Sequence, residues 1–253
     1  MRDPVSILIT GASSGLGEAL ARAYARPGVA LFLCGRDAAR LDAVAACCRG
    51  LGAAVEARVV DVADCGAMED WIAAAERVRP LDLVIANAGI SGGTSGQGET
   101  GAQARAIFAV NFGGIVNTVL PALAAMRERR RGQIALMGSL AGFRGMPGAP
   151  AYGASKGAVR LWGEGLRGWL ADEGIEVSVI CPGFVTTRMT AVNRFPMPFL
   201  MDPDRAARII VAGLAANRGR IAFPWPMLAL AWLLALLPDV AAERITRGLP
   251  RKG

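Results

Sequence analysis

The 253-residue sequence contains no histidine. This absence excludes a Ser-His-Asp triad, a histidine-ligated zinc site and a histidine general base. The five cysteines are odd in number and show neither CxxC nor metal-ligand spacing, so no metal site is predicted. Lysine and tyrosine occur only twice each, whereas 26 of the 28 basic residues are arginine. In a chain that uses arginine almost everywhere, Lys156 is an exception that calls for a specific explanation.

Charge is scarce as well, at 19% of residues against 53% hydrophobic residues, which argues against disorder. The net charge of +7 raises the question of nucleic acid. However, the arginines are scattered, and the one dense run, Arg127 to Arg131, lies where cations offset a helix dipole. It has no interleaved aromatic residues for base stacking, so no nucleic-acid partner is expected. Strand-like residues begin at Val5 without a signal-peptide pattern, which with the cysteine usage predicts a cytoplasmic location.

Short apolar runs alternate with helical patterns from the start to about residue 223. The runs are continuous, as expected for parallel strands covered on both faces. They predict an α/β fold, a doubly wound parallel sheet (Rossmann fold) with helices on both faces. We expect one domain, 1–253, with a core over 5–190 and a variable substrate lid and apolar C-terminal segment over 184–253. The expected strands are Val5–Thr10, Ala30–Cys34, Ala54–Val60, Leu81–Ala86, Gly132–Gly138, Ile175–Cys181 and Gly219–Phe223, and the expected helices are 15–26, 38–51, 66–78, 102–129, 151–173 and 203–217.

Two regions break this alternation. Residues 91–101 are too rich in glycine for regular structure, and residues 184–203 contain three prolines. Both regions follow predicted strand ends, which is the side where open α/β sheets bind ligands.

A glycine-rich loop joins the first expected strand to an alanine-rich helix. Glycines permit a tight turn and close approach to a pyrophosphate, and the helix N-terminus adds unpaired N–H groups. A glycine-rich stretch can also be a simple turn, but its place between strand and helix favours a dinucleotide site. The loop has the spacing G-x₃-G-x-G, and its candidate cofactor-binding residues are Gly11, Ser13, Ser14, Gly15, Leu16 and Gly17.

The end of the second strand bears on the choice of cofactor. An acidic residue there would bind the ribose hydroxyls and select NAD. Gly35 stands at that position and Arg36 follows, and an arginine can pair with a 2′-phosphate. This favours NADP(H), with NAD(H) as the alternative. Asp37 takes the acidic role if the register is off by two, and Arg36 is then a solvated surface residue.

Tyr152 and Lys156 are four residues apart in a helical stretch and share one face. A lysine ammonium would lower the tyrosine pKa from about 10 and make the phenol a usable acid/base near neutral pH. The alternative is an ordinary contact on an exposed helix. Ser139, just past the fifth strand, could hold a carbonyl oxygen, although a serine there is also typical of a turn or an N-cap.

Taken in order, these motifs resemble those of the classical short-chain dehydrogenase/reductase family, from residue 5 to about 190. The resemblance implies that Asn111 holds a proton-relay water through a local helix distortion. It also implies contacts of Asp61-Val62 with adenine and of the Pro182-Gly183 stretch with the nicotinamide. The further cofactor-binding positions that it implies are Asp61, Val62, Asn87, Ala88, Gly89, Pro182, Gly183, Val185 and Thr186, besides Tyr152 and Lys156.

The activity that the resemblance implies is hydride transfer between a nicotinamide cofactor and a carbonyl or secondary alcohol. Ser139 orients the oxygen, Tyr152 donates the proton, Lys156 tunes Tyr152 and holds the nicotinamide ribose, and Asn111 links Lys156 to solvent. We expect NADPH-dependent reduction of a ketone or aldehyde. The alternatives are an NAD-dependent alcohol dehydrogenase and a catalytically silent dinucleotide-binding regulatory protein. The rare tyrosine and lysine argue against the silent protein.

The segment from Thr187 to Met201 is rich in Met, Phe and Pro and is expected to form a mobile lid. Its side chains offer an adaptable apolar surface, which favours a lipophilic small-molecule carbonyl or alcohol. The alternative is a lid that packs its own side chains. The side chains in question are Met189, Phe195, Met197, Phe199 and Met201.

Residues 221–238 carry no charge. Pro224 and Pro226 limit the expected helix to Met227–Leu237, which is too short to span a membrane. Three interpretations remain: a helix buried against the sheet or a second subunit, a roof over the substrate pocket, or peripheral membrane contact. The family resemblance of helix 151–173 implies a homodimer or homotetramer. In the membrane interpretation the interfacial residues are Trp225, Trp232, Arg244, Arg247, Arg251 and Lys252.

Overall fold

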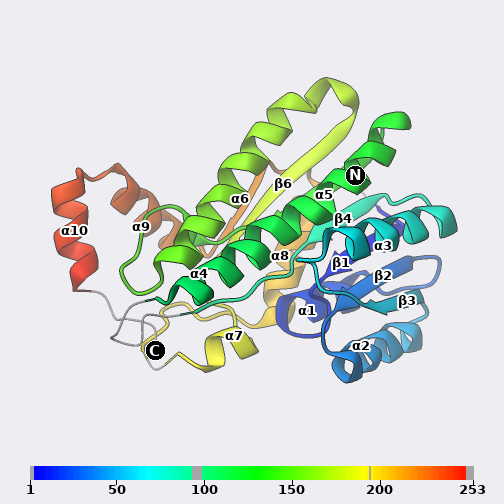
Figure 1. Ribbon diagram of the computed structural model, residues 1–253, viewed down its shortest axis with the longest axis horizontal. Coiled ribbons are helices and arrows are strands. Elements are labelled where there is room, and N and C mark those ends of the chain that lie inside the picture. The colour runs from blue at the N-terminus through cyan, green and yellow to red at the C-terminus, as the bar shows by residue number, and fades with distance from the viewer. Residues whose placement is uncertain (1–2, 93–98, 194, 249–253) are drawn as a thin grey trace.

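The computed structural model describes residues 3–92, 99–193 and 195–248, and its centre is a seven-stranded parallel sheet (Figure 1). The strand order is β3-β2-β1-β4-β5-β6-β7. The order reverses between β1 and β4, where open α/β sheets form a ligand crevice. The predicted doubly wound sheet is confirmed. Its strands are β1 (Ser6–Thr10), β2 (Ala30–Gly35), β3 (Ala54–Val59), β4 (Leu83–Ala86), β5 (Gly132–Met137), β6 (Ile175–Pro182) and β7 (Arg220–Phe223).

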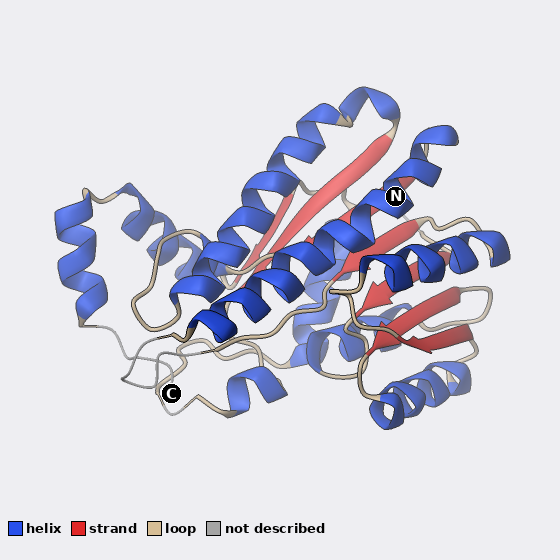
Figure 2. Ribbon diagram, viewed as in Figure 1, coloured by secondary structure: helices blue, strands red, loops and turns tan. Residues whose placement is uncertain are grey.

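Helices cover both faces of the sheet (Figure 2). They are α1 (Gly15–Tyr24), α2 (Ala38–Gly50), α3 (Cys65–Val78), α4 (Gly101–Phe108), α5 (Gly114–Glu128), α6 (Pro150–Trp169), α7 (Arg188–Ala191), α8 (Pro203–Ala215), α9 (Trp225–Leu236) and α10 (Asp239–Arg247). Successive residues of a strand point to opposite faces. Ile7 and Ile9 therefore join the core beneath α1, α2 and α8, whereas Leu8 joins the core beneath α3, α5 and α6.

Two expected helices are divided. The stretch expected over 102–129 consists of α4, a π-helical turn at Ala109–Gly113, and α5. The stretch expected over 151–173 ends as α6 at Trp169 and continues as a 3-10 turn. The apolar pattern runs through both interruptions, so periodicity alone does not reveal them.

The C-terminal segment differs most from expectation. Helix α9 begins at Trp225 because Pro226 stands in its first turn, where proline is tolerated. Leu234 is its one buried residue, and most of the helix is exposed or half-buried, so the prediction that this helix is buried against the sheet is wrong. Helix α10 follows and is not among the expected helices. Both helices project from the sheet at one end of the molecule (Figure 1). Arg251, Lys252 and residues 93–98 of the glycine-rich loop lie outside the described residues.

Candidate active site

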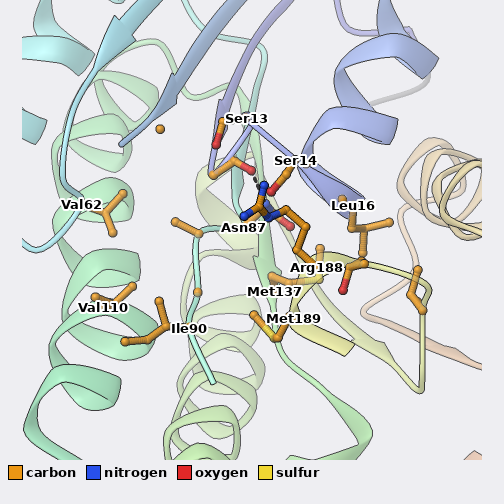
Figure 3. Close-up of a pocket in the computed structure, with 18 of the residues that line it drawn as sticks. Ser13, Ser14, Leu16, Val62, Asn87, Ile90, Val110, Met137, Arg188 and Met189 are labelled. Atoms are coloured by element: carbon orange, nitrogen blue, oxygen red, sulfur yellow. Dashed lines mark hydrogen bonds between the residues drawn. The ribbon is translucent and has the colours of Figure 1, made fainter. Parts of the chain in front are cut away.

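A cleft of about 510 Å³ lies over the carboxyl ends of the central strands. It extends from the end of β2, past the β1–α1 loop, to the loops that follow β5 and β6 (Figure 3). Most of the predicted site residues line this one cleft. Those that do are Gly11, Ser13, Ser14, Gly15, Leu16, Gly17, Arg36, Asp61, Val62, Asn87, Ala88, Gly89, Ser139, Tyr152, Lys156, Pro182, Gly183 and Val185.

The β1–α1 loop requires its glycines. Gly11 and Gly15 have φ of 65° and 61°, a region that other residues rarely adopt. A Cβ on Gly17 would lie 2.3 Å from the Gly11 carbonyl oxygen. Ser14 is the N-cap of α1 but makes no side-chain capping bond, so it leaves the first-turn N–H groups uncapped. The loop is therefore a preformed anion cradle of the dinucleotide-binding kind.

A hydrogen-bonded lock between β1 and β4 holds this cradle. Asn87 Nδ2 donates to the Thr10 carbonyl oxygen at 2.9 Å. In return Thr10 Oγ1 accepts from the backbone N–H groups of Asn87 and Ala88 at 3.0 and 3.1 Å. Asn87 thus lines the cleft, and its side-chain amide also fixes the glycine loop. The resemblance alone does not specify this structural role.

At the far end of the cleft, Gly35 contacts the glycine loop. A Cβ on Gly35 would lie 3.0 Å from Ser13 Oγ, so a side chain here would displace Ser13 slightly. The nearby Asp37 carboxylate caps α2, accepting from the Arg40 N–H at 3.0 Å, and also pairs with the Arg40 guanidinium at 2.8 Å. Both of its oxygens are therefore engaged within α2.

Arg36 is more exposed and more weakly paired than Arg40 at this end of the cleft. Its guanidinium is 59% exposed and lies 3.9 Å from the Asp61 carboxylate, a long and solvated contact that contributes little. Asp61 also accepts from the Ala63 N–H at 3.0 Å, which shapes the turn after β3. The arrangement leaves Arg36 available to an anionic ligand at the edge of the cleft.

Tyr152, Ser139 and Lys156 meet at the opposite end. Burial raises the pKa of Tyr152, and a hydrogen bond with the Ser139 hydroxyl lowers it in part. Lys156 Nζ donates to the Met137 carbonyl oxygen at 2.7 Å and lies 6.0 Å from the Tyr152 ring centre. The expected lowering of the Tyr152 pKa by Lys156 is therefore wrong for this geometry, because the ammonium is held by β5 and burial dominates. Burial also lowers the pKa of Lys156, to about 8.

Asn111 lies in the π-helical turn and is fully buried. Its Oδ1 accepts from the Ile90 N–H at 2.7 Å, and its Nδ2 donates to the Ile90 carbonyl at 2.9 Å and to Ser155 Oγ at 3.0 Å. Asn111 does not line the cleft directly. A Cβ on Gly89 would lie 3.3 Å from Asn111 Oδ1 and 3.4 Å from Lys156 Nζ, so this glycine lets the two groups lie close.

The loop that carries Ser139 packs tightly on α6. The Ser139 hydroxyl caps a 3-10 turn, accepting from the Ala141 N–H at 3.1 Å. A Cβ on Gly142 would lie only 2.6 Å from the Lys156 carbonyl carbon, and one on Gly153 would lie 3.2 Å from the Ala141 carbonyl oxygen. These two glycines allow the close approach that brings Ser139 to Tyr152 and Lys156.

Comparison with known proteins agrees with this geometry. The family model described as short chain dehydrogenase matches residues 6–196. The chain belongs to the short-chain dehydrogenase family. An uncharacterized oxidoreductase of Myxococcus xanthus is 39% identical over 94% of this chain and 96% of its own length. Galactitol 2-dehydrogenase (L-tagatose-forming) of Cereibacter sphaeroides is 38% identical over 76% of each chain. A solved short-chain dehydrogenase from Sphingobium yanoikuyae in complex with NADPH is 28% identical, with a TM-score of 0.79 over 96% of each chain.

The predicted family and enzyme class are therefore confirmed. This short-chain dehydrogenase is an oxidoreductase that uses a nicotinamide cofactor.

The dehydrogenase departs from the predicted site at Thr186. This residue is exposed and outside the cleft, and its backbone N–H donates to the Met201 carbonyl at 2.9 Å. Thr187 lines the cleft instead, and a Cβ on Gly15 would lie 3.0 Å from its Cγ2. The cleft is also lined by residues outside the predicted set, namely Gly35, Asp37, Arg40, Val60, Ile90, Val110, Met137, Gly138, Thr187, Arg188, Met189 and Thr190.

The lid of the dehydrogenase packs much of its own apolar surface. Met201 is buried in the core, and the Phe184 and Phe195 rings pack edge to face with centres 6.0 Å apart. Met189 lines the cleft, whereas Phe199 is exposed. Of the apolar lid residues singled out in the sequence, Met189 is thus the one that faces the cleft among the described residues.

Proposed function

We propose that this dehydrogenase catalyses the NADPH-dependent reduction of a lipophilic ketone or aldehyde. The observation that carries the proposal is a single cleft that has candidate cofactor-binding residues at one end and candidate acid/base residues at the other. A glycine-loop cradle with Arg36 at its edge lies toward one end, and Ser139, Tyr152 and Lys156 lie at the other. The solved relative in complex with NADPH supports the choice of cofactor.

The residues present fit a nicotinamide dinucleotide. The glycine loop has no room for a Cβ at Gly17 and exposes the first turn of α1, as a diphosphate requires. When bound, NADPH supplies a hydride for the carbonyl carbon of the substrate. The residues proposed to hold the cofactor, from the adenine end to the nicotinamide end, are Arg36, Asp61, Val62, Gly11, Ser13, Ser14, Gly15, Leu16, Gly17, Asn87, Ala88, Gly89, Lys156, Pro182, Gly183, Val185 and Thr187.

In the proposed mechanism, Ser139 donates a hydrogen bond to the carbonyl oxygen and orients it. Tyr152 gives its phenolic proton to that oxygen as it becomes an alcohol, a proton transfer typical of general acid catalysis. Lys156 is an ammonium below its pKa of about 8, and we assign it the hold on the nicotinamide ribose. Asn111 borders the space beside Gly89 and Lys156, and we assign it the link through which the proton is resupplied.

Three features support NADPH over NADH. Gly35 provides no carboxylate at the end of β2, and the Asp37 carboxylate is held by α2 and Arg40. Arg36 is left as an exposed cation at the cleft edge. An NAD-dependent alcohol dehydrogenase is the second candidate function. The similarity to a galactitol dehydrogenase favours it, so the test compares both cofactors.

The proposal is tested by NADPH and NADH oxidation with a panel of lipophilic and polar carbonyls. We expect turnover with NADPH, and we expect Arg36→Ala to weaken NADPH binding by about tenfold or more while NADH binding stays the same. Arg77→Ala on α3, which removes an exposed arginine outside the cleft, is the matched control. A preference for NADH in the wild type, or equal loss in both arginine variants, would refute the assignment of Arg36.

A lipophilic substrate is favoured by the apolar walls of the cleft. Met189 and Met137 line it together with Ile90 and Val110, and Figure 3 shows Ile90 and Val110 on the side of Val62. Thioether and aliphatic side chains adapt to apolar ligands of different shape. The substrate is therefore expected among compounds with a large hydrocarbon or aromatic body, rather than among charged metabolites.

Two partner surfaces complete the proposal. The outer face of α6 exposes Leu161 and Trp169, which supports a homodimer or homotetramer through this helix.

On α9, Trp225 is 76% and Leu236 83% exposed. This helix carries no charge, and the chain has a net charge of +7, which suits an anionic bilayer surface. We therefore assign α9 to peripheral membrane contact in a protein of the cytoplasm.

The double variant Leu233→Glu/Leu236→Glu tests the membrane contact. It places two carboxylates on the exposed side of α9 and should reduce co-sedimentation with phosphatidylglycerol vesicles at least fivefold, because charge is expensive at the apolar boundary. Light scattering on the same samples measures the oligomeric state. Unchanged co-sedimentation would refute the contact, and a smaller oligomer in the variant would assign α9 to a subunit interface instead.

A further inference from the structure

The charges in the dinucleotide cleft are unevenly distributed. Arg36 and Arg40 stand at the 2′-phosphate end, close to Asp61 and Asp37, and Lys156 stands at the nicotinamide end. Between them, the glycine loop supplies backbone N–H groups but no side-chain cation. A dinucleotide carries two negative charges at this middle position, so the proposed function leaves them opposed by helix and backbone dipoles only.

Arg188 supplies a cation there from the lid. It is the first residue of α7 and lines the cleft together with Gly11, Ser14 and Asn87. Figure 3 shows its side chain extending from the lid toward the glycine loop, with the guanidinium in front of Asn87 and beside Ser14. Among the described residues, no carboxylate forms an ion pair with Arg188, so none of them neutralises its charge.

The turn that carries Arg188 is well fixed. Thr187 and Thr190 form a reciprocal capping box around α7. The Thr190 hydroxyl also donates to the Val185 carbonyl oxygen at 2.7 Å, and Thr187 contacts the glycine loop at Gly15. The guanidinium therefore projects from a braced turn, which limits the entropy lost when it binds an anion.

We propose that Arg188 is the side-chain clamp for the cofactor diphosphate, closing over it from the lid side opposite the glycine loop. This inference rests on the proposed dinucleotide function and adds a side-chain ligand for the diphosphate to it.

The test measures Kd by calorimetry for NADPH, for ADP-ribose, which has the diphosphate but neither 2′-phosphate nor nicotinamide, and for adenosine 2′-monophosphate, which lacks the diphosphate. We expect Arg188→Gln to weaken NADPH and ADP-ribose at least tenfold and to leave adenosine 2′-monophosphate unchanged. Arg188→Lys should restore part of the affinity, because it keeps the charge but not the fork. Arg208→Gln, which removes an exposed arginine on α8 outside the cleft, is the matched control.

The outcomes separate this clamp from the proposed function. NADPH affinity in Arg188→Gln within twofold of wild type would overturn the clamp and leave the function standing. The clamp is likewise overturned if only the KM for the carbonyl substrate rises, since Arg188 would then face the substrate. Failure of the folded wild type to bind NADPH at all would overturn both proposals.

Discussion

Replacing Tyr152 with phenylalanine is expected to lower kcat/KM for carbonyl reduction by roughly 10²- to 10⁴-fold. The change removes only the phenolic hydroxyl, which contacts Ser139 in the cleft. Ring packing on α6 is kept, so the Kd for NADPH should stay within about twofold. Steady-state NADPH oxidation with a responsive carbonyl measures the first quantity, and fluorescence titration with NADPH measures the second.

The second tyrosine of the chain is the natural control. Tyr24 lies on α1, is buried in the core and does not line the cleft. Tyr24→Phe should therefore keep wild-type turnover. Full activity in Tyr152→Phe would mean that another group donates the proton. Loss of NADPH binding in Tyr152→Phe would instead indicate that the hydroxyl has a structural role.

Gly142→Ala is expected to disturb the site without altering any chemical group in it. The added Cβ would lie 2.6 Å from the Lys156 carbonyl carbon and 2.7 Å from the Gly157 amide nitrogen, and neither backbone atom can move independently of α6. Overpacking of this kind destabilises a fold by ~1–3 kcal/mol. The shift of the Ser139 loop relative to Tyr152 should lower kcat by about 10²-fold, as misplacements near 1 Å do.

Gly145→Ala provides the comparison for this variant. The position is exposed, and a Cβ there would meet no atom within 4 Å. Thermal unfolding and steady-state turnover should therefore match the wild type in Gly145→Ala and fall in Gly142→Ala. Equal behaviour of the two variants would show that the loop adapts and that its close contact with α6 is dispensable.

The parts of the fold and site that follow from local sequence are predictable. The glycine loop is contiguous, and Tyr152 and Lys156 share a helix face because four residues make about one turn. Continuous apolar runs likewise predict buried parallel strands. These features depend on neighbours within a few positions, so the sequence alone specifies them.

Features that depend on distant contacts are not predictable in this way. The Met137 carbonyl that holds Lys156 and the Gly142 contact with α6 arise only when β5 and α6 are packed together. The effect of burial on the Tyr152 pKa is of the same kind and reverses the expected direction. Arg188 gives no signal, because one arginine among 26 does not stand out until the lid places it in the cleft.

The remaining differences between prediction and structure concern a one-residue shift at Thr186 and the position of a proline in α9. Thr186 and Thr187 are adjacent, and only the turn geometry before α7 decides which of them faces the glycine loop. At the other end of the chain, the helix expected to begin after Pro226 instead includes this proline in its first turn. The exposure of α9 is not predictable either, since an apolar helix is usually buried.

The hydrogen bond from Lys156 to Met137 also determines how the dehydrogenase can diversify. The ammonium is anchored to β5, Ser139 lies two residues beyond that anchor, and Tyr152 shares α6 with Lys156. In the described part of the chain, these anchors do not involve residues 184–203, whereas α9 packs against Leu140, next to Ser139, through Met227 and Leu228. On the proposed function, acid/base chemistry and substrate choice are therefore carried by separate segments. Insertions and substitutions in the lid can then change which carbonyl compound is accepted while the proton donor keeps its position. One fold can therefore serve many metabolic roles.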